Sequence, residues 1–329
     1  MKVGYLRFDE RPGIKAKALA YMSFYNDIDF FYFRPEDVDL LNKTISGLFL
    51  VNNEWERKIT SFPNIIDNAP SRPRDRAIYQ EIKKISPMIT YRIGDKEKVF
   101  QLLKKDVNYT QYLIDSDILS SIDIYLKYID KFKTVIIKPK GGNMGKGIYK
   151  SYISDNRYVF QTDIDYEEFD NIEDVEIFLK DFMDTNQIQQ YIDSNTIEGH
   201  PYDIRLHVQR GKGGNWKIVK IYPRIGLSQK VTSNLSQGGG ISNLNSFLKS
   251  QFGDQSEYIR TELRNLAINL PKDFQKNYSY TLDALGIDVG IDSENNLKIF
   301  EINTYPGSNF LDLESAIVRV EYYKYLLTK

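Results

Sequence analysis

A glycine-rich loop between two strand-like stretches is the feature that most constrains the fold of this chain. Residues 135–138 (VIIK) have the apolar, β-branched character of a buried strand that ends in Lys138, and residues 148–153 (IYKSYI) follow as a return strand. Glycines let backbone N–H groups approach phosphate oxygens closely, and a lysine at the strand end adds fixed positive charge. The glycines of this loop are Gly141, Gly142, Gly145 and Gly147.

The loop differs from the common nucleotide-binding pattern G-x-x-x-x-G-K-[ST]. Lys146 is followed by Gly147, and a strand rather than a helix comes next. Taken alone, the loop is compatible with a phosphate-binding hairpin and also with a flexible hairpin whose lysines are merely solvated. Other motifs have to decide between the two.

The order of helix and strand signals divides the chain into three segments. Residues 1–90 alternate strands with helices, which is typical of parallel βαβ units. Residues 91–192 contain the glycine loop, and residues 193–329 are richer in strands. We therefore expect an α/β fold that becomes α+β in its C-terminal part. The expected strands are 2–8, 28–33, 47–51, 64–67, 135–138, 148–153, 187–192, 202–210, 216–222, 287–291 and 297–302, and the expected helices are 13–24, 75–84, 96–105, 172–183 and 258–270.

Two acids and an amide lie on the last two expected strands. Glu301 and Asn303 are two residues apart, so their side chains point to the same face of a strand, and Asp288 lies on the neighbouring strand. Carboxylate and amide oxygens suit Mg²⁺ that bridges nucleotide phosphates. The competing interpretation, a hairpin with solvated acids, is weakened by apolar neighbours such as Ile287 and Ile302.

Three cations lie beside apolar residues: Lys96, Arg205 and Arg224. A single such residue is usually a surface charge. Together with a glycine loop and a metal site they would form a cradle in which guanidinium groups contact phosphate oxygens bidentately.

Composition removes several classes of site. The 329 residues include no cysteine, which excludes disulfides, thiolate zinc sites, Fe–S clusters and a cysteine nucleophile. Two histidines, His200 and His207, leave little material for a multi-histidine metal site or a catalytic triad. A net charge of −1 disfavours a nucleic-acid partner recognised by bulk charge. The N-terminus has no apolar signal region and no long apolar run follows, so we expect no membrane role and a cytoplasmic protein.

Taken in order, these motifs resemble the ATP-grasp superfamily over essentially the whole chain, and within it the YheC/YheD-like, spore-coat-associated ATP-grasp proteins. A more distant likeness is to ribosomal-protein glutamate ligases. The resemblance implies an N-terminal parallel-sheet domain (1–90) and two α+β subdomains (91–192 and 193–329) that clasp ATP. The segments that carry it are IIDNAPSRPRDR, DKEKVFQLL, IIKPKGGNMGKGI, YDIRLHVQR, SNLSQGGG, LGIDVGID and FEINTYPGSN.

The resemblance implies a nucleotide site. Lys96 and Lys138 match the lysines that contact the phosphates, and residues 141–147, with the loop lysines Lys140 and Lys146, match the loop that closes over the triphosphate. The residues that match the adenine-binding hinge are Gln190, Tyr191 and Ile192, with backbone groups of the last two facing the ring edge. The two candidates for the acid that holds the ribose hydroxyls are Asp193 and Glu198.

The same resemblance implies the reaction groups. Asp288, Glu301 and Asn303 match ligands of Mg²⁺, of which two ions are expected. Arg205 and Arg224 match arginines near the γ-phosphate and the acyl-phosphate intermediate. The residues that match the acceptor side are Asn234 and the turn 238–240.

The implied activity is ATP-dependent joining of a carboxylate, from a small molecule or a peptide, to an amine acceptor. Such a ligase releases ADP and phosphate, and Lys138, Arg205 and Arg224 would stabilise charge during the reaction. A homodimer is compatible with the resemblance.

Two other functions stay open at this point. One is a non-catalytic ATP-binding or structural, coat-associated protein, although retention of all three predicted metal ligands argues against it. The other is an ATP-dependent phosphotransferase that uses a histidine, because His207 lies two residues after Arg205 on the same strand face. A structural histidine is the more common role at such a position.

Overall fold

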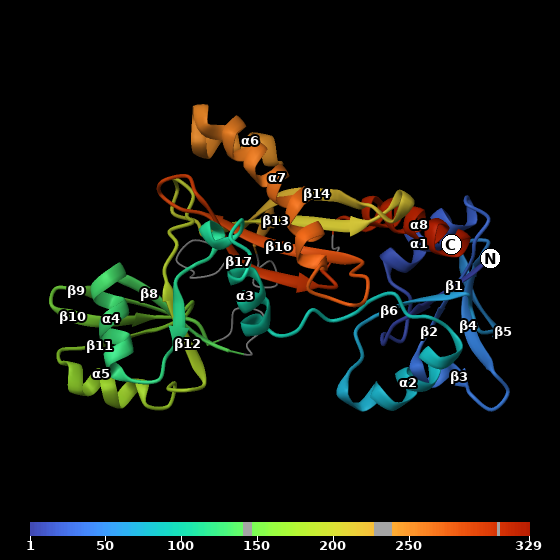
Figure 1. The fold of residues 1–329 in the computed structure, drawn as a ribbon, viewed down its shortest axis with the longest axis horizontal. Helices are drawn as coiled ribbons and strands as arrows, with labels where there is room; N and C mark the ends of the chain where they lie inside the picture. The colour runs from blue at the N-terminus through green and yellow to red at the C-terminus, as the bar shows by residue number, and fades with distance from the viewer. Residues whose placement is uncertain (141–146, 227–238, 308–309) are drawn as a thin grey trace.

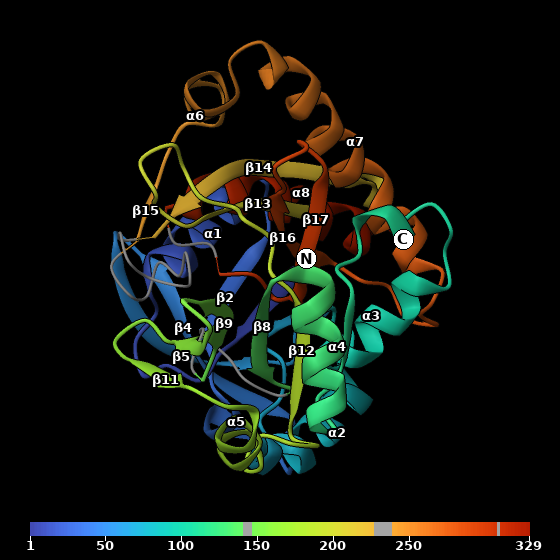
Figure 2. The same cartoon turned by 90° about the vertical axis from the view of Figure 1, so that its left-hand side faces the viewer.

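The computed structural model describes residues 1–140, 147–226, 239–307 and 310–329. These residues contain three sheets, built in turn from residues 2–68, 116–190 and 202–304 (Figure 1). Figure 2 shows the strands of the third sheet above those of the second, with the first sheet behind them. The short 3₁₀ helices are η1 (Pro35–Asp37), η2 (Pro73–Asp75), η3 (Thr110–Tyr112), η4 (Lys212–Gly214) and η6 (Gly253–Gln255).

The first sheet has a parallel centre, as the strand–helix alternation predicts. Its central strands β2, β1 and β6 are parallel and are accompanied by α1 and α2. The sheet continues through antiparallel strands, because β4 forms a hairpin with β5 whose side chains are largely exposed and therefore lack a clear apolar signal. The bounds are β1 (Lys2–Leu6), α1 (Ile14–Phe24), β2 (Asp29–Phe33), β3 (Val38–Asp39), β4 (Thr44–Val51), β5 (Glu54–Ser61), β6 (Ile65–Asn68) and α2 (Arg76–Ile85).

The second sheet is antiparallel and has the strand order β11-β10-β9-β8-β12-β7. On one face, Val135, Ile137 and Ile188 join a core with residues of α4 and α5. Ile136 and Lys138 alternate with Val135 and Ile137, so they point to the opposite face. The bounds are α3 (Lys96–Lys104), β7 (Ser116–Ile118), α4 (Ile122–Phe132), β8 (Thr134–Pro139), β9 (Tyr149–Ser154), β10 (Arg157–Gln161), β11 (Tyr166–Phe169), α5 (Ile172–Leu179) and β12 (Asn186–Gln190).

The third sheet has the strand order β15-β14-β13-β16-β17. One face is apolar and packs on the long helix α7, as the buried cluster that joins Ile204, Leu206 and Ile287 to Leu263 shows. Its other face is polar and lies toward the second sheet (Figure 2). The bounds are β13 (Tyr202–Arg210), β14 (Trp216–Ile225), β15 (Gly240–Ile241), α6 (Leu244–Phe252), α7 (Ser256–Gln275), β16 (Ala284–Ile291) and β17 (Leu297–Thr304).

The last helix, α8 (Asp312–Thr328), packs with the beginning of the chain. It lies beside α1, and Val320 and Tyr323 join the core of the first sheet with Val3 and Leu19 (Figure 1). The helix therefore ties the first sheet to the third, from which it emerges. Across the described residues, we find no helix with the length and apolar character needed to cross a membrane.

Candidate functional site

The polar face of the third sheet aligns three of the predicted site residues. Arg205 on β13 lies opposite Asp288 on β16, and Asp288 lies opposite Glu301 on β17. Residues directly opposed on neighbouring strands point to the same face of a sheet. Asn303 lies in the next row, opposite Gly286, which in turn faces His207. Register thus brings the predicted metal ligands and one predicted arginine together.

Asp288 is held between the two predicted arginines. Arg205 donates to both of its carboxylate oxygens, and Arg224 lies 3.1 Å from Oδ2 through Nη2. Arg224 also donates to Asp203, with distances of 2.6 and 2.8 Å. Burial alone would raise the pKa of Asp288, but the guanidinium groups of Arg205 and Arg224 outweigh it and hold that pKa below its ordinary value. The four side chains form a charge-balanced, buried cluster.

Asp203 is a site residue that sequence reasoning missed. Strand β13 carries a polar residue at every second position, and these side chains are all buried, with 6% exposure at Asp203, 8% at Arg205, 1% at His207 and 2% at Gln209. An alternating strand with one polar face normally turns that face to water. The detectable signal is the polar run Asp-x-Arg-x-His-x-Gln itself, which is too rich in charge and hydrogen-bonding groups for an ordinary solvent face.

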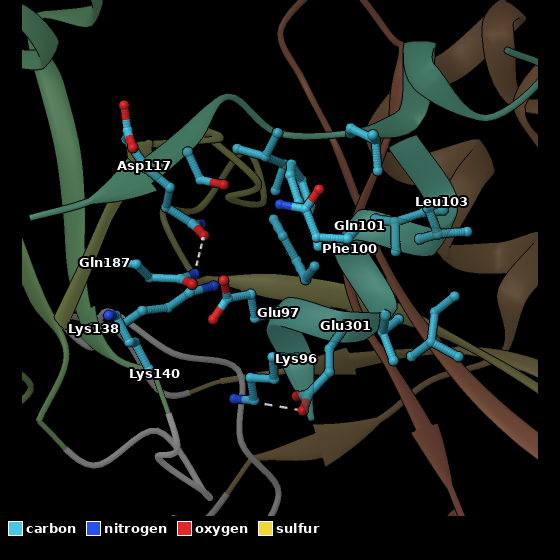
Figure 3. Close-up of a pocket in the computed structure, with 18 of the residues that line it drawn as sticks. Lys96, Glu97, Phe100, Gln101, Leu103, Asp117, Lys138, Lys140, Gln187 and Glu301 are labelled. Carbon is cyan, nitrogen blue, oxygen red and sulfur yellow. Dashed lines mark hydrogen bonds and ion pairs between the residues drawn. The ribbon is translucent and has the colours of Figure 1, made fainter. Parts of the chain in front are cut away.

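The predicted lysines meet Glu301 in one pocket between the second and third sheets. Lys96 begins α3, where Asp95 caps the helix, and its Nζ lies 3.4 Å from Oε1 of Glu301. Lys138 and Lys140 enter the same pocket from the end of β8 (Figure 3). Burial and the nearby charge of Lys96 lower the pKa of Lys138 to about 8, although Glu301 opposes the shift.

Other walls of this pocket were not predicted. Gln187 lies opposite Lys138 in the sheet and its amide is 3.5 Å from Gln189 (Figure 3). Glu97 lies next to Lys96 and also lines the pocket. The predicted hinge residues are not among its lining residues. Its apolar wall consists of Val99, Phe100, Leu103, Leu113, Ile114, Ile118, Ile299, Phe300 and Ile302.

The predicted adenine hinge connects the second sheet to the third. Strand β12 ends at Gln190, so Tyr191 and Ile192 follow the strand instead of continuing it. The amide of Tyr191 donates to Thr134, and the carbonyl of Ile192 accepts from the amide of Ser194. Within the described part of the chain, the carbonyl of Tyr191 and the amide of Ile192 have no backbone partner. The carbonyl is an acceptor and the amide a donor, as the predicted adenine-binding hinge needs, and this role stays a prediction.

The two candidate ribose acids lie in different surroundings. Asp193 lies 3.5 Å from the Tyr191 hydroxyl, and Lys150 lies 4.2 Å over the ring of Tyr191 on the side of β9. Glu198 is exposed and interacts with Thr196, in its own loop, and with Gln251. Because Asp193 contacts the predicted hinge residue Tyr191, it is a better candidate than Glu198 for the acid that holds the ribose hydroxyls. This role stays a prediction.

The glycine loop is described only at its end. Gly147 is exposed and has a φ of 71°, a left-handed conformation that favours glycine. Of the acceptor-side turn 238–240, Gly239 and Gly240 are described, and Gly240 begins β15. The predicted residues that lie outside the described residues are Gly141, Gly142, Gly145, Lys146, Asn234 and Gly238.

The predicted metal ligands have the chemical type that Mg²⁺ prefers. Asp288, Glu301 and Asn303 offer only oxygen ligands, which Mg²⁺ prefers. Among the described residues no three His, Asp or Glu side chains converge on one point, so the third protein donor would have to be the Asn303 amide. Both carboxylates carry ion pairs, which a bound cation would have to replace.

The comparison with protein families identifies the family of this chain. Residues 86–328 match the family described as YheC/D like ATP-grasp. The chain belongs to this ATP-grasp family. The match confirms both the resemblance found in the sequence and the expected ATP-grasp fold.

Two proteins of Bacillus subtilis (strain 168) are similar to this chain. "Endospore coat-associated protein YheD" is 28% identical over 294 residues, which cover 84% of this chain and 64% of that protein. "Endospore coat-associated protein YheC" is 22% identical over 295 residues, which cover 85% and 81%. This ATP-grasp chain therefore spans less than two thirds of the length of the YheD relative.

Solved structures resemble the chain along nearly its whole length. A RiPP-associated ATP-grasp ligase of Chryseobacterium gregarium, in complex with ADP and a leader and core peptide, has a TM-score of 0.50 at 11% identity and covers 98% of this chain and 97% of its own. A RimK domain ATP-grasp protein of Sphaerobacter thermophilus DSM 20745 has a TM-score of 0.49 at 11% identity and covers 98% and 100%. The first likeness shows a shared fold with an ATP-grasp ligase.

Proposed function

We propose that this ATP-grasp chain is an ATP-dependent carboxylate–amine ligase that releases ADP and phosphate. The observation that carries the proposal is one pocket in which Glu301, at the end of the row Arg205–Asp288–Glu301, meets Lys96 and Lys138. Cations for phosphates and an oxygen ligand for a divalent cation then line the same pocket. The ligase in complex with ADP that shares the fold supports the nucleotide.

The reaction we propose proceeds in two displacements. A substrate carboxylate oxygen attacks the γ-phosphorus, the bond to the β,γ-bridging oxygen breaks, and ADP leaves with that electron pair. The acyl phosphate is then attacked by an amine, which loses a proton as the carbon–oxygen bond to phosphate breaks. Neither step needs a nucleophilic side chain, which fits a chain without cysteine.

The residues of this chain would act by position and charge. Lys96 and Lys138 would neutralise the phosphates, and Arg205 and Arg224 would contact the oxygens on which charge develops. Mg²⁺, when bound by Asp288, Glu301 and Asn303, would supply further charge neutralisation at the phosphates. The ion pairs of Asp288 and Glu301 hold these acids in place before the nucleotide enters.

The first test is carboxylate activation in the presence of hydroxylamine. The protein is incubated with Mg–ATP, hydroxylamine and a panel of amino acids, hydroxy acids and short peptides, and hydroxamates are detected by mass spectrometry. Hydroxylamine replaces the amine, so only the acid has to be found. Glu301→Gln removes one charge from the proposed metal site and should lower the rate by about 10²–10³-fold or more. Glu294→Gln, on the exposed turn between the same two strands, should keep the rate.

The outcomes separate the ligase from its alternative. A hydroxamate that is lost only in Glu301→Gln supports the ligase. If ATP raises the melting temperature but no acid gives a hydroxamate, the ligase proposal is contradicted and a non-catalytic nucleotide-binding role is favoured.

A further inference from the structure

A lysine of the first segment lies beside the polar face of the third sheet. Lys15 is the second residue of α1, the helix that follows the carboxyl end of β1. Ligands of open α/β sheets bind at the carboxyl ends of the strands. This end touches the proposed ligase site, because the guanidinium of Arg7 lies 5.1 Å from the ring centroid of Tyr305, two residues after Asn303.

Lys15 has no counterion in the described part of the chain, although acids are close. Asp67 is shared by Arg7 at 2.9 Å and Arg319 at 2.7 Å, and Arg319 also binds Asp283 at 2.6 Å. Those pairs occupy the buried carboxylates of this region. Burial and the charges of Arg319 and Arg7 lower the pKa of Lys15 to about 8, against the opposing charges of Asp67 and Asp312. The charged form of Lys15 is therefore less favoured here than in water.

A buried histidine near Lys15 has one ring nitrogen without a hydrogen-bond partner among the described residues. His207 is buried, and the positive charge of Lys15 is one cause that, after burial, lowers its pKa. The side-chain amide of Gln209 lies 3.2 Å from Nε2 of this histidine and also donates to Ser315. With Nε2 as acceptor, the neutral ring carries its proton at Nδ1, and this buried nitrogen has no partner among the described residues.

The helix itself adds donors at the same place. The first amides of α1 have no partner within the helix, and no side chain caps them. A lysine in the first turn opposes the helix dipole, which favours negative charge there. In the described part of the chain, the helix amides, the Lys15 ammonium and the buried N–H are donors without an acceptor, and an anion would satisfy all three.

The other charged side chains of the proposed site form ion pairs or have a proposed role in phosphate binding. Arg205 and Arg224 are balanced by Asp288 and Asp203, and Lys96 by Glu301. Our proposed function assigns Lys138, with Lys96, to the phosphates, and Lys140 lines the same pocket. His207, whose pKa the charge of Lys15 lowers, lies two residues along β13 from Arg205, a distance of about 7 Å. In the described part of the chain, Lys15 forms no ion pair.

We propose that Lys15 binds the carboxylate of the acid substrate, with the first-turn amides of α1 and the Nδ1 proton of His207 as further donors. The proposal rests on the proposed ligase function and adds to it that the first segment supplies a substrate-binding residue. A carboxylate held at Lys15 lies next to Arg205, the arginine we place at the γ-phosphate. His207 is then a donor and not a phosphorylated nucleophile.

The test compares Lys15→Met and Lys15→Arg with the control Lys17→Met, which changes a lysine of the same helix. For the acid that gives a hydroxamate, Lys15→Met should raise the KM for the acid at least tenfold and leave the KM for ATP within twofold. Lys15→Arg should recover most of the loss, and Lys17→Met should match the unchanged protein. A loss that falls equally on both KM values, or that Lys17→Met shares, contradicts the proposal.

A second readout does not depend on turnover. Without ligand, Lys15→Met should raise the melting temperature, because it removes an unpaired cation beside two arginines. With Mg–ADP present, sodium acetate and sodium succinate should raise the melting temperature of the unchanged protein more than sodium chloride does, and Lys15→Met should lose this difference. Equal protection of both proteins, or a lower melting temperature of unliganded Lys15→Met, overturns the carboxylate site. Protection that depends on Lys15, in a protein that forms no hydroxamate, would contradict the ligase and leave the anion site standing.

Discussion

At the scale of single residues, Lys138 is a cation whose surroundings favour the binding of an anionic ligand. Its side chain has no ion pair in the described structure, and burial together with the charge of Lys96 lowers its pKa to about 8. A lysine so placed favours the arrival of negative charge, since a phosphate would restore the stability of its charged form. Arg205 and Arg224 differ from it, because their charges are already balanced by acids.

The pKa of Lys138 predicts how nucleotide affinity depends on pH. Phosphates would raise this pKa, so binding takes up a proton wherever the free protein has lost one. We expect ADP affinity to be nearly constant below pH 8 and to fall above it, by at most tenfold per pH unit. Titration calorimetry at pH 9 in two buffers of different ionisation enthalpy should detect the proton uptake. Lys138→Arg should abolish it, and uptake that persists in this variant would contradict the assignment.

At the scale of elements, the register of β13, β16 and β17 builds the site. Gly286 lies between His207 and Asn303 and leaves room for its neighbours. An added Cβ there would lie 2.8 Å from Cβ of Pro306 and 3.1 Å from Nη1 of Arg205. The absence of a side chain therefore lets the loop after β17 close over the sheet next to Arg205.

We predict that Gly286→Ala displaces both neighbours. Pro306 is rigid, so the contact cannot be relieved by a rotamer change, and overpacking of this kind costs about 1–3 kcal/mol. Hydroxamate formation should fall by more than the stability loss explains, because Arg205 has to move. Chemical denaturation and the activity assay measure the two effects. Gly240→Ala is the control for stability, since a Cβ there meets nothing within 4 Å. Full activity of Gly286→Ala would show that this close approach is unimportant.

Elements were predictable where their periodicity was clear. The strand–loop–strand unit around the glycine loop, the hairpin of β13 and β14 and the final pair β16 and β17 were predicted close to their observed bounds. The sequence did not predict helices α4, α6 and α8 or strands β5, β10 and β11. In β5 the reason is an exposed surface. In α8 the buried face itself carries the polar residues Ser315 and Arg319, while apolar Ile317 is exposed, so no clear amphipathic pattern results.

At the scale of the whole molecule, one buried ion network joins the first and last segments. Asp67 on β6 accepts from Arg7, from Arg319 of α8 and from the Tyr323 hydroxyl. Arg319 reaches Asp283, at the entry to β16. Burial opposes the charge of Asp67, but Arg319 and Arg7 prevail and hold its pKa well below the ordinary value. Through this network the first sheet is fixed against the sheet that carries the proposed site.

We predict that Asp67→Asn costs about 3–5 kcal/mol at pH 7, because buried Arg7 loses its acid partner and buried Arg319 keeps only Asp283 among the described residues. A carboxyl group whose pKa is lowered by folding stabilises the protein above its unfolded pKa, near 4, and that contribution disappears as the pH falls. The unchanged protein should therefore lose stability steeply below pH 4, and Asp67→Asn less steeply. Urea denaturation across pH 3–7 measures both. The control is Asp130→Asn, whose side chain is exposed, and equal acid slopes for all three proteins would contradict the assignment.

The sequence alone determined the order of the elements and the chemical types at the site. Strand alternation, the glycine loop and the same-face pair Glu301 and Asn303 are local properties, because they follow from spacing along one segment. On that basis and on the resemblance, Lys96 and Lys138 were predicted to contact phosphates and Glu301 to bind Mg²⁺, and these roles stay predictions.

Tertiary structure alone decided which charges are paired. Asp203 binds Arg224, Asp67 joins both ends of the chain, and Lys15 has no counterion among the residues that the structure describes. Ion pairing depends on distances between segments that lie far apart in sequence, and no local period records those distances. For the same reason, the proposed substrate contacts of Lys15 and His207 could be inferred only from the tertiary structure, which brings the first segment and β13 together.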